Sequence, residues 1–187
     1  MKEHRGVPHL YGITPLWPSK KQVLKKGDVV KIDLVASYKG YHGDSAYTYI
    51  VGEVSKDVEK LLKVTEEALY AGISKVKDGA HLGDVSAAIG DYIKPYGYGI
   101  LENYTGHGIG REMHEEPAIF NYGTPGEGPI LKEGMVLCIE PMVCMGTNKV
   151  RVLKDGWSVQ ALDKKPTAHF EHTVVVRKDG YEILTKL

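Results

Sequence analysis

The sequence predicts a single α+β domain in which helices pack on one face of an antiparallel sheet. Two β-rich segments flank a glycine-containing turn, two helical patterns follow, and the remainder is mostly strand-like. The 22 glycines and 12 tyrosines agree with this, since Gly permits tight turns and Tyr is enriched in strands. At 187 residues, with no internal repeat or linker, the chain has the length of one domain.

An irregular segment and a hairpin are expected first. Residues 1–22 show no clear periodicity and contain three prolines, so we assign 1–17 to an irregular N-terminal segment and 18–187 to the folded domain. The run VVKIDL at 29–34 and the run YHGDSAYTYIV at 41–51 flank Lys39-Gly40. This pattern predicts an antiparallel hairpin.

Two helices and several strands come next. Ser55 is placed to cap a helix over about 56–76, and a second helix is predicted over about 84–95, because apolar residues recur there at helical spacing. Strands are predicted at 134–143, 158–162 and 169–177, and the Gly- and Pro-rich segment 121–129 is predicted to be a loop.

The composition argues against several classes of function. Equal numbers of basic and acidic residues, 24 each, provide no electrostatic footprint for nucleic acid or a membrane surface. Cys138 and Cys144 form no CxxC pair, which disfavours a disulfide scaffold or structural zinc and fits a cytoplasmic protein. The first twenty residues lack an unbroken apolar core, so we expect no signal peptide, and no run is long enough to span a membrane.

Asp33 and Asp44 stand in β-rich segments, where acidic residues are disfavoured. A turn near residues 38–40 sets the two positions opposite or diagonal across the hairpin, so their carboxylates project from the same face. Convergent carboxylates repel each other unless a cation or a proton neutralises them. For this hairpin alone, the alternative is that one or both aspartates are solvent-facing strand residues.

His107 lies between two glycines in YTGHGIGREMHEEP, and His114 follows seven residues later. The glycines are expected to leave the His107 imidazole accessible and to let the backbone approach a ligand. A phosphate-binding loop is a weaker interpretation, because no clear strand leads in and no long helix follows. Taken singly, each histidine also fits a hydrogen-bonded structural residue.

Glu140 in VLCIEPMV and Glu171 in AHFEHTVVVR stand within apolar strands. Burial of an ionised carboxylate without a partner is costly, so each needs a positive partner unless it faces solvent or titrates. Together the four acids and His107 predict an oxygen-rich site suited to Mn, Fe, Co or Zn. Four negative charges match two divalent cations, which in hydrolases lie about 3.5–4 Å apart and activate a water.

Five stretches of the chain resemble the signature blocks of type I methionine aminopeptidases: KIDLVASYKGYHGDSAYTYIVG, YTGHGIGREMHEEPAIFNYGTPG, LKEGMVLCIEPMV, DGWSV and AHFEHTVVV. The resemblance extends from about Pro18 to Leu187, and the five candidate ligands have the family's spacing. It implies the pita-bread fold, a curved antiparallel sheet with helices on its outer face, here with an incomplete N-terminal part.

The resemblance implies two divalent ions (Co, Mn, Fe or Zn) held by five side chains, Asp33, Asp44, His107, Glu140 and Glu171. Asp44 and Glu171 would bridge the ions, and Glu140 would act as general base. His114 would hydrogen-bond the substrate carbonyl and its oxyanion, and Trp157 would lie beside the methionine pocket. The implied reaction is hydrolytic removal of the N-terminal methionine from nascent proteins with a small second residue, transiently near the ribosome.

The front of the chain departs from the family pattern. Pro15, in TPLWPSKK, takes the place of a histidine that contacts substrate in the family's HGxP block. This predicts reduced activity, and it keeps open a non-catalytic binding module with the same fold. A pita-bread peptidase that acts before proline (Xaa-Pro-type) is another alternative, although the HEEPAIFNYG block looks more like the methionine-removing enzymes.

Overall fold

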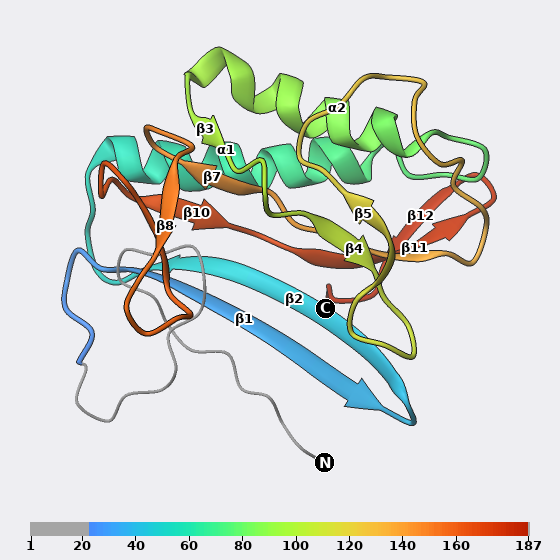
Figure 1. Cartoon of the computed structure of the whole chain (residues 1–187), viewed down its shortest axis with the longest axis horizontal. Helices are drawn as coiled ribbons and strands as arrows, with labels where there is room; N and C mark the ends of the chain where they lie inside the picture. Colours follow the sequence, from blue (N-terminus) through green and yellow to red (C-terminus); the bar gives the residue numbers. More distant parts are fainter. Residues whose placement is uncertain (1–22, 187) are drawn as a thin grey trace.

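The computed structural model of the chain describes residues 23–186 and shows an α+β architecture, as predicted. Helices α1 (Lys56–Ile73) and α2 (Leu82–Ile93) lie on one side of the central strands. The long hairpin of β1 (Val29–Tyr38) and β2 (Tyr41–Ile50) lies on the other side (Figure 1). The predicted irregular segment 1–17, with Pro15, falls outside the described residues.

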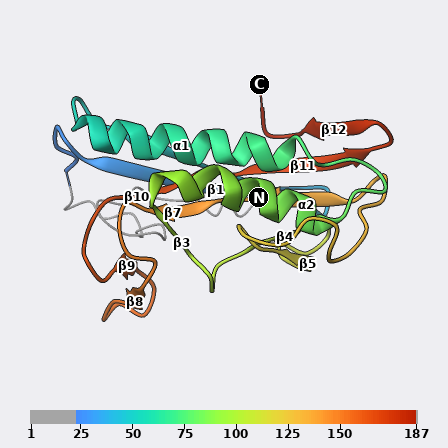
Figure 2. The same ribbon diagram turned by 90° about the horizontal axis from the view of Figure 1, so that it is seen from above.

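The other strands are short. They form a five-stranded sheet of order β12-β11-β6-β4-β5, a three-stranded sheet of order β10-β7-β3, and a separate pair, β8 and β9, all antiparallel (Figure 2). Their bounds, with the short 3-10 helix η1 after α2, are η1 (Lys94–Tyr96), β3 (Gly99–Ile100), β4 (Gly106–Gly108), β5 (Glu115–Ile119), β6 (Val136–Ile139), β7 (Met142–Cys144), β8 (Val150–Val152), β9 (Val159–Ala161), β10 (Thr167–His169), β11 (His172–Arg177) and β12 (Gly180–Ile183).

The predicted strands at 134–143 and 169–177 are each divided in the structure, the first into β6 and β7 and the second into β10 and β11. The pairing register is the same on both sides of the division, because Ile139 pairs with His172 and Met142 pairs with His169. Glu140 and Glu171 therefore face each other across the gap. Pro141 contributes to the division, since proline has no N–H to donate to a strand ladder.

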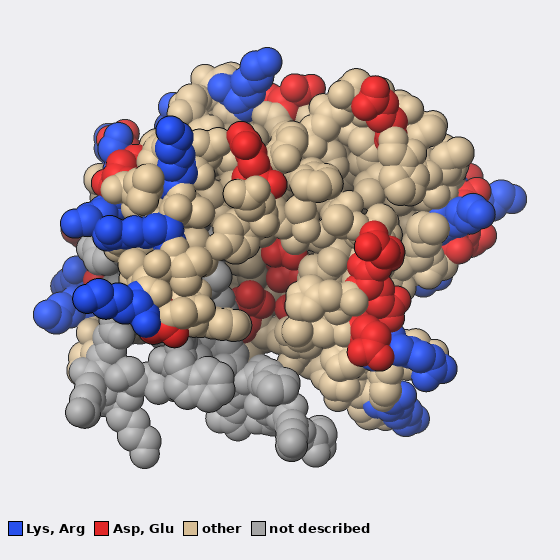
Figure 3. Space-filling view, viewed as in Figure 1, with Lys and Arg blue, Asp and Glu red and all other residues tan. Residues whose placement is uncertain are grey.

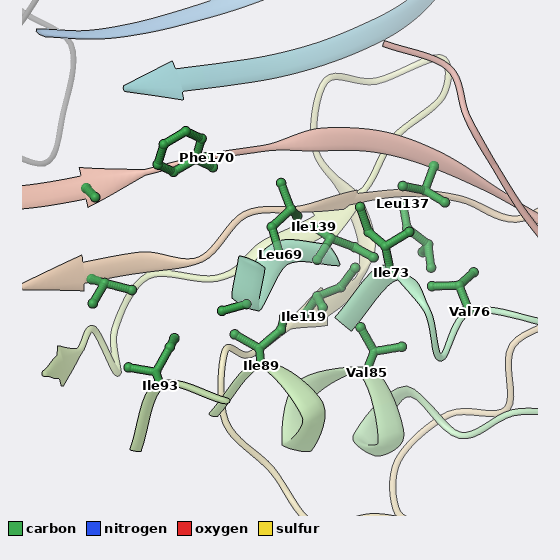
Figure 4. Packing of buried hydrophobic residues seen from close by; sticks show 14 of the residues in the cluster. Leu69, Ile73, Val76, Val85, Ile89, Ile93, Ile119, Leu137, Ile139 and Phe170 are labelled. Carbon is green, nitrogen blue, oxygen red and sulfur yellow. The ribbon is translucent and has the colours of Figure 1, made fainter. Parts of the chain in front are cut away.

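The central strands have two different faces. Leu137 and Ile139 of β6, with Val174 and Val176 of β11, belong to the main apolar core against α1 and α2 (Figure 4). Because strand side chains alternate between faces, Cys138 and the interrupting glutamates point away from the helices. The apolar face holds the fold together, and the opposite face is free for polar chemistry.

The helices agree with the sequence prediction within a few residues. The Ser55 side chain accepts a hydrogen bond from the N–H of Val58 at 3.4 Å, which confirms it as the N-cap of α1. Helix α1 ends at Ile73 rather than near residue 76, and α2 spans 82–93 rather than 84–95. No helix within residues 23–186 combines the length and apolarity needed to cross a bilayer.

Candidate metal centre

The hairpin brings Asp33 and Asp44 to one face, as predicted. Asp33 pairs with Ala46 and Asp44 pairs with Val35, so the two aspartates are diagonal neighbours rather than direct partners. Asp44 is buried and Asp33 is half-buried. Asp44 is therefore not a solvent-facing aspartate, whereas Asp33 keeps partial contact with solvent.

Strand β2 lies against the divided strand β10–β11. The Thr173 hydroxyl accepts from the backbone N–H of Asp44 at 2.9 Å and donates to the Asp44 carbonyl at 2.7 Å. The backbone N–H of Glu171 donates to the Ala46 carbonyl at 2.8 Å. These contacts place Asp44 beside Glu171 although the two are far apart in the sequence.

His107 belongs to a strand and is buried, which differs from the accessible loop histidine that we predicted. It lies on β4, pairs with Cys138 of β6 and is 8% exposed. The flanking glycines serve strand packing: an added Cβ at Gly106 would lie 2.3 Å from the Cys138 carbonyl oxygen, and one at Gly108 would lie 2.2 Å from that of Glu116. Glycine is needed at both positions because the backbones of β5 and β6 approach β4 too closely for a side chain.

The tautomer of His107 follows from its contacts. Nδ1 lies 2.9 Å from the Gly108 carbonyl oxygen, which can only accept, so Nδ1 carries the proton. The lone pair of Nε2 is therefore free, and Nε2 lies 3.4 Å from Oε1 of Glu140. A hydrogen bond at one ring nitrogen that orients the other is usual for a metal-binding histidine.

Two overlapping groups of potential ligand atoms converge at the gap. Asp44, His107, Cys138 and Glu171 form one group, and Glu140, His169 and Glu171 form the other, with the atoms of each group within 4.8 Å of one another. Asp33 belongs to neither, but its charge acts on Asp44, Glu140 and Glu171. All five sequence-predicted ligands thus lie at or beside one site.

Burial and mutual repulsion set the electrostatics of this cluster. Burial, followed by the charges of Asp33 and Glu140, raises the pKa of Asp44 to about 8. Burial and the neighbouring carboxylates also raise the pKa values of Glu140 and Glu171 well above the ordinary range. Such a cluster cannot hold all its negative charges at neutral pH without a compensating cation.

The donor set fits divalent cations. Oδ1 of Asp44, Oε1 of Glu171 and Nε2 of His169 are buried without a hydrogen-bond partner among the described residues. Buried polar atoms are normally satisfied, and these three face one cluster of carboxylates and imidazoles. Carboxylate oxygen with imidazole nitrogen is the ligand combination of Mn, Fe, Co and Zn sites.

His114 and Trp157 lie outside the buried cluster. The exposed His114 ring packs edge-on against that of His107, with centroids 4.4 Å apart. Trp157 lies between β8 and β9 and is 58% exposed. Figure 3 shows acidic side chains (red) at the bottom of a hollow in the middle of this face of the molecule.

Sequence reasoning missed two residues of the cluster, His169 and Cys138. Each precedes a predicted ligand by two positions, His169 before Glu171 and Cys138 before Glu140. In a strand, residues two positions apart point to the same face. This alternation is the sequence signal that could have identified both residues.

The comparisons with known proteins agree with this geometry. The sequence profile of metallopeptidase family M24 matches residues 3–178. The chain belongs to metallopeptidase family M24. Membership in this family implies divalent metal binding, for which the cluster supplies potential ligands.

Similar M24 proteins carry more specific names. Methionine aminopeptidase 1 of Bacillus subtilis is 49% identical over 166 residues, which are 89% of this chain and 67% of that protein. The solved methionine aminopeptidase of Thermotoga maritima is 46% identical with a TM-score of 0.92, covering 95% of this chain and 71% of that one. The chain therefore spans about two thirds of the length of such relatives.

A prolidase from Pyrococcus furiosus is more distant. It is 28% identical with a TM-score of 0.76 and covers all of this chain but 49% of its own. The likeness to both kinds of peptidase confirms the pita-bread fold predicted from the sequence resemblance.

Proposed function

We propose that this chain is a methionine aminopeptidase that removes the N-terminal methionine from cytoplasmic nascent proteins with a small second residue. The observation that carries the proposal is the meeting of four separate segments, β2, β4, β6–β7 and β10–β11, at one buried cluster of acids and imidazoles, with Asp33 of β1 beside it. Relatives named methionine aminopeptidase, at 47–49% identity, support the substrate.

In this proposal two divalent ions (Co, Mn, Fe or Zn) are held by Asp33, Asp44, His107, Glu140 and Glu171. Asp44 and Glu171 would be shared by both ions, which agrees with the burial of both residues and with the hydrogen bond that ties the Glu171 backbone to Ala46 of β2. When bound, such a pair supplies Lewis acidity that activates water and stabilises an oxyanion. The four carboxylates balance the charge of two divalent ions.

Glu140 is the proposed general base. Its carboxylate lies at the gap between β6 and β7, with His107 Nε2 3.4 Å from one oxygen and His169 Nε2 3.3 Å from the other. It would take a proton from the attacking water and pass it to the departing amine. The two imidazoles lie on either side of the carboxylate.

His114 is the proposed donor to the substrate carbonyl and to the oxyanion that develops from it. Its exposed ring sits against that of His107, so it reaches the solvent side of the cluster. Trp157 is the proposed side wall of the methionine pocket, and its 58% exposure leaves an aromatic surface for a flexible thioether chain.

Substitution of the general base tests the reaction. In the presence of Mn, Fe or Co, Glu140→Gln should reduce hydrolysis of Met-Ala peptides by about 10²–10⁴-fold, the usual contribution of a positioned base. The rate of methionine release measures this. Retention of the parent rate would remove Glu140 from the proposed role.

Two other functions give different outcomes in the same assay. Pro15 stands where the family has a substrate-contacting histidine, so we expect slower turnover than in relatives that keep it. A chain that binds metal but releases no methionine would be the binding module. The likeness to a prolidase makes Xaa-Pro peptides the second substrate to assay, and preferential cleavage of those would reassign the specificity.

A further inference from the structure

His169 is a buried histidine of the site to which the sequence resemblance gives no role. It ends β10, two residues before Glu171, and its side chain therefore faces the carboxylate cluster. The residue is 4% exposed, and Nε2 has no hydrogen-bond partner among the described residues. Nε2 lies 3.3 Å from Oε2 of Glu140 and groups with Glu140 and Glu171 as a potential ligand set.

The two buried imidazoles occupy equivalent positions around Glu140. His107 approaches Oε1 from β4, and His169 approaches Oε2 from β10. Each belongs to a different group of convergent ligand atoms, and Glu171 belongs to both groups. This arrangement offers one imidazole to each half of a two-ion site, with Glu171 common to both groups.

The backbone at His169 is fixed from both sides. Its N–H donates to the Thr48 hydroxyl at 2.9 Å, and that hydroxyl donates to the His169 carbonyl at 2.6 Å. Thr48 belongs to β2, the strand that also carries Asp44. The imidazole is thus held against the hairpin side of the cluster, and the charge of Asp33 acts on it there.

We propose that His169 is a sixth protein ligand, which gives the second metal ion an imidazole nitrogen as His107 does the first. The inference rests on the two-ion site proposed above. The second ion would then have a mixed nitrogen and oxygen environment instead of an all-oxygen one. Imidazole favours Zn, Co and Fe over harder ions such as Mn, so the second position should bind those metals more tightly.

The simpler interpretation is that His169 only pairs with Glu140, at 3.3 Å, and so positions its carboxylate. A glutamine at this position would keep an N–H donor for Glu140 but would lack the imidazole nitrogen. The comparison of His169→Gln with the parent chain therefore separates a ligand from a hydrogen-bonding residue.

Proton NMR of the full chain loaded with Co²⁺ tests the inference directly. Each cobalt-bound imidazole keeps one exchangeable ring N–H, whose resonance is strongly shifted by the paramagnetic ion. We expect two such resonances in the parent chain and one in His169→Gln. One resonance in the parent chain at full loading would overturn the inference without any variant.

Calorimetric titration with Co²⁺ supplies the affinities. We expect His169→Gln to weaken one of two binding events by more than the roughly 10–100-fold that loss of a residue which only orients a ligand costs, and to leave the other event unchanged. The control is His172→Gln, because His172 bonds Tyr70 and Thr185 instead of facing the site. It should keep both events and both resonances.

The outcomes separate this inference from the proposed function. Two events of unchanged affinity in His169→Gln would overturn the ligand role and leave the two-metal enzyme standing. A parent chain that binds no Co²⁺ would overturn both.

Discussion

At the scale of single residues, the acids of the site are arranged for a cation that must displace protons. Burial raises the pKa values of Asp44, Glu140 and Glu171, and their mutual charges raise them further. The metal-free cluster is therefore partly protonated at neutral pH. Divalent ions reverse this preference, because the bound carboxylates must be ionised.

Metal uptake should consequently release protons. At pH 7 Asp44, with a pKa of about 8, is largely protonated in the metal-free chain and must lose its proton on binding. Titrations with Mn²⁺ or Co²⁺ in buffers of different ionisation enthalpy should give different apparent heats, corresponding to net proton release. Heats that do not depend on the buffer would show that the carboxyls are already ionised.

Single residues also mark what the sequence could and could not predict. The acids were detectable because each interrupts an apolar or β-rich run. His169 and Cys138 gave no such contrast, since a histidine or a cysteine is unremarkable in a strand. They could have been added to the candidate site only by assuming that Glu140 and Glu171 lie on the strand face that forms the site.

At the scale of elements, the site depends on how the β1–β2 hairpin docks. The hairpin and its diagonal aspartates could be predicted, because turn and strand signals are local. The division of two predicted strands at Glu140 and Glu171 could not be predicted, because the apolar pattern of each strand continues on both sides of the break. β4 also escaped prediction, because two of its three residues are glycines.

Two threonine hydroxyls, of Thr48 and Thr173, attach β2 to the divided strand. Thr173→Val keeps the shape but leaves the N–H and carbonyl of Asp44 without that partner. We expect a loss of about 1–3 kcal/mol in the free energy of unfolding, together with weaker metal binding.

Urea denaturation of the metal-free chain and calorimetry with Mn²⁺ would measure the two effects. Ser45→Ala is the control, because it removes a longer, partly buried bond of 3.2 Å to the Glu171 carbonyl and should cost less. Equal effects of the two substitutions would argue against a special role for Thr173.

At the scale of the whole molecule, stability and function occupy opposite faces of the same strands. The core between the helices and the strands is apolar, whereas the layer between the strands and the hairpin contains the carboxylates. In the metal-free state, ionisation of these buried carboxylates destabilises the folded chain, because their charges repel one another and are shielded from water. The α+β class followed from the order of elements, but this layering depends on long-range pairing that no local pattern contains.

The metal-free chain should therefore lose stability as the pH rises. A carboxyl whose pKa is higher in the folded than in the unfolded state favours folding below its unfolded pKa, and this contribution disappears as the pH passes the folded pKa. For Asp44 that window runs from about 4 in the unfolded chain to about 8 in the folded protein.

Urea denaturation with a chelator should show a lower free energy of unfolding at pH 8.5 than at pH 5.5. Bound metal should abolish the difference, and Asp44→Asn should reduce it. A metal-free chain that becomes more stable over this range would contradict the pKa assignments.

The central claim is that side chains from distant segments hold a pair of metal ions. The most direct measurement is anomalous X-ray scattering from crystals grown with Mn²⁺ or Co²⁺. We predict two peaks about 3.5–4 Å apart, bridged by Asp44 and Glu171. Crystals fully equilibrated with metal that show no peak between these two carboxylates would contradict the account.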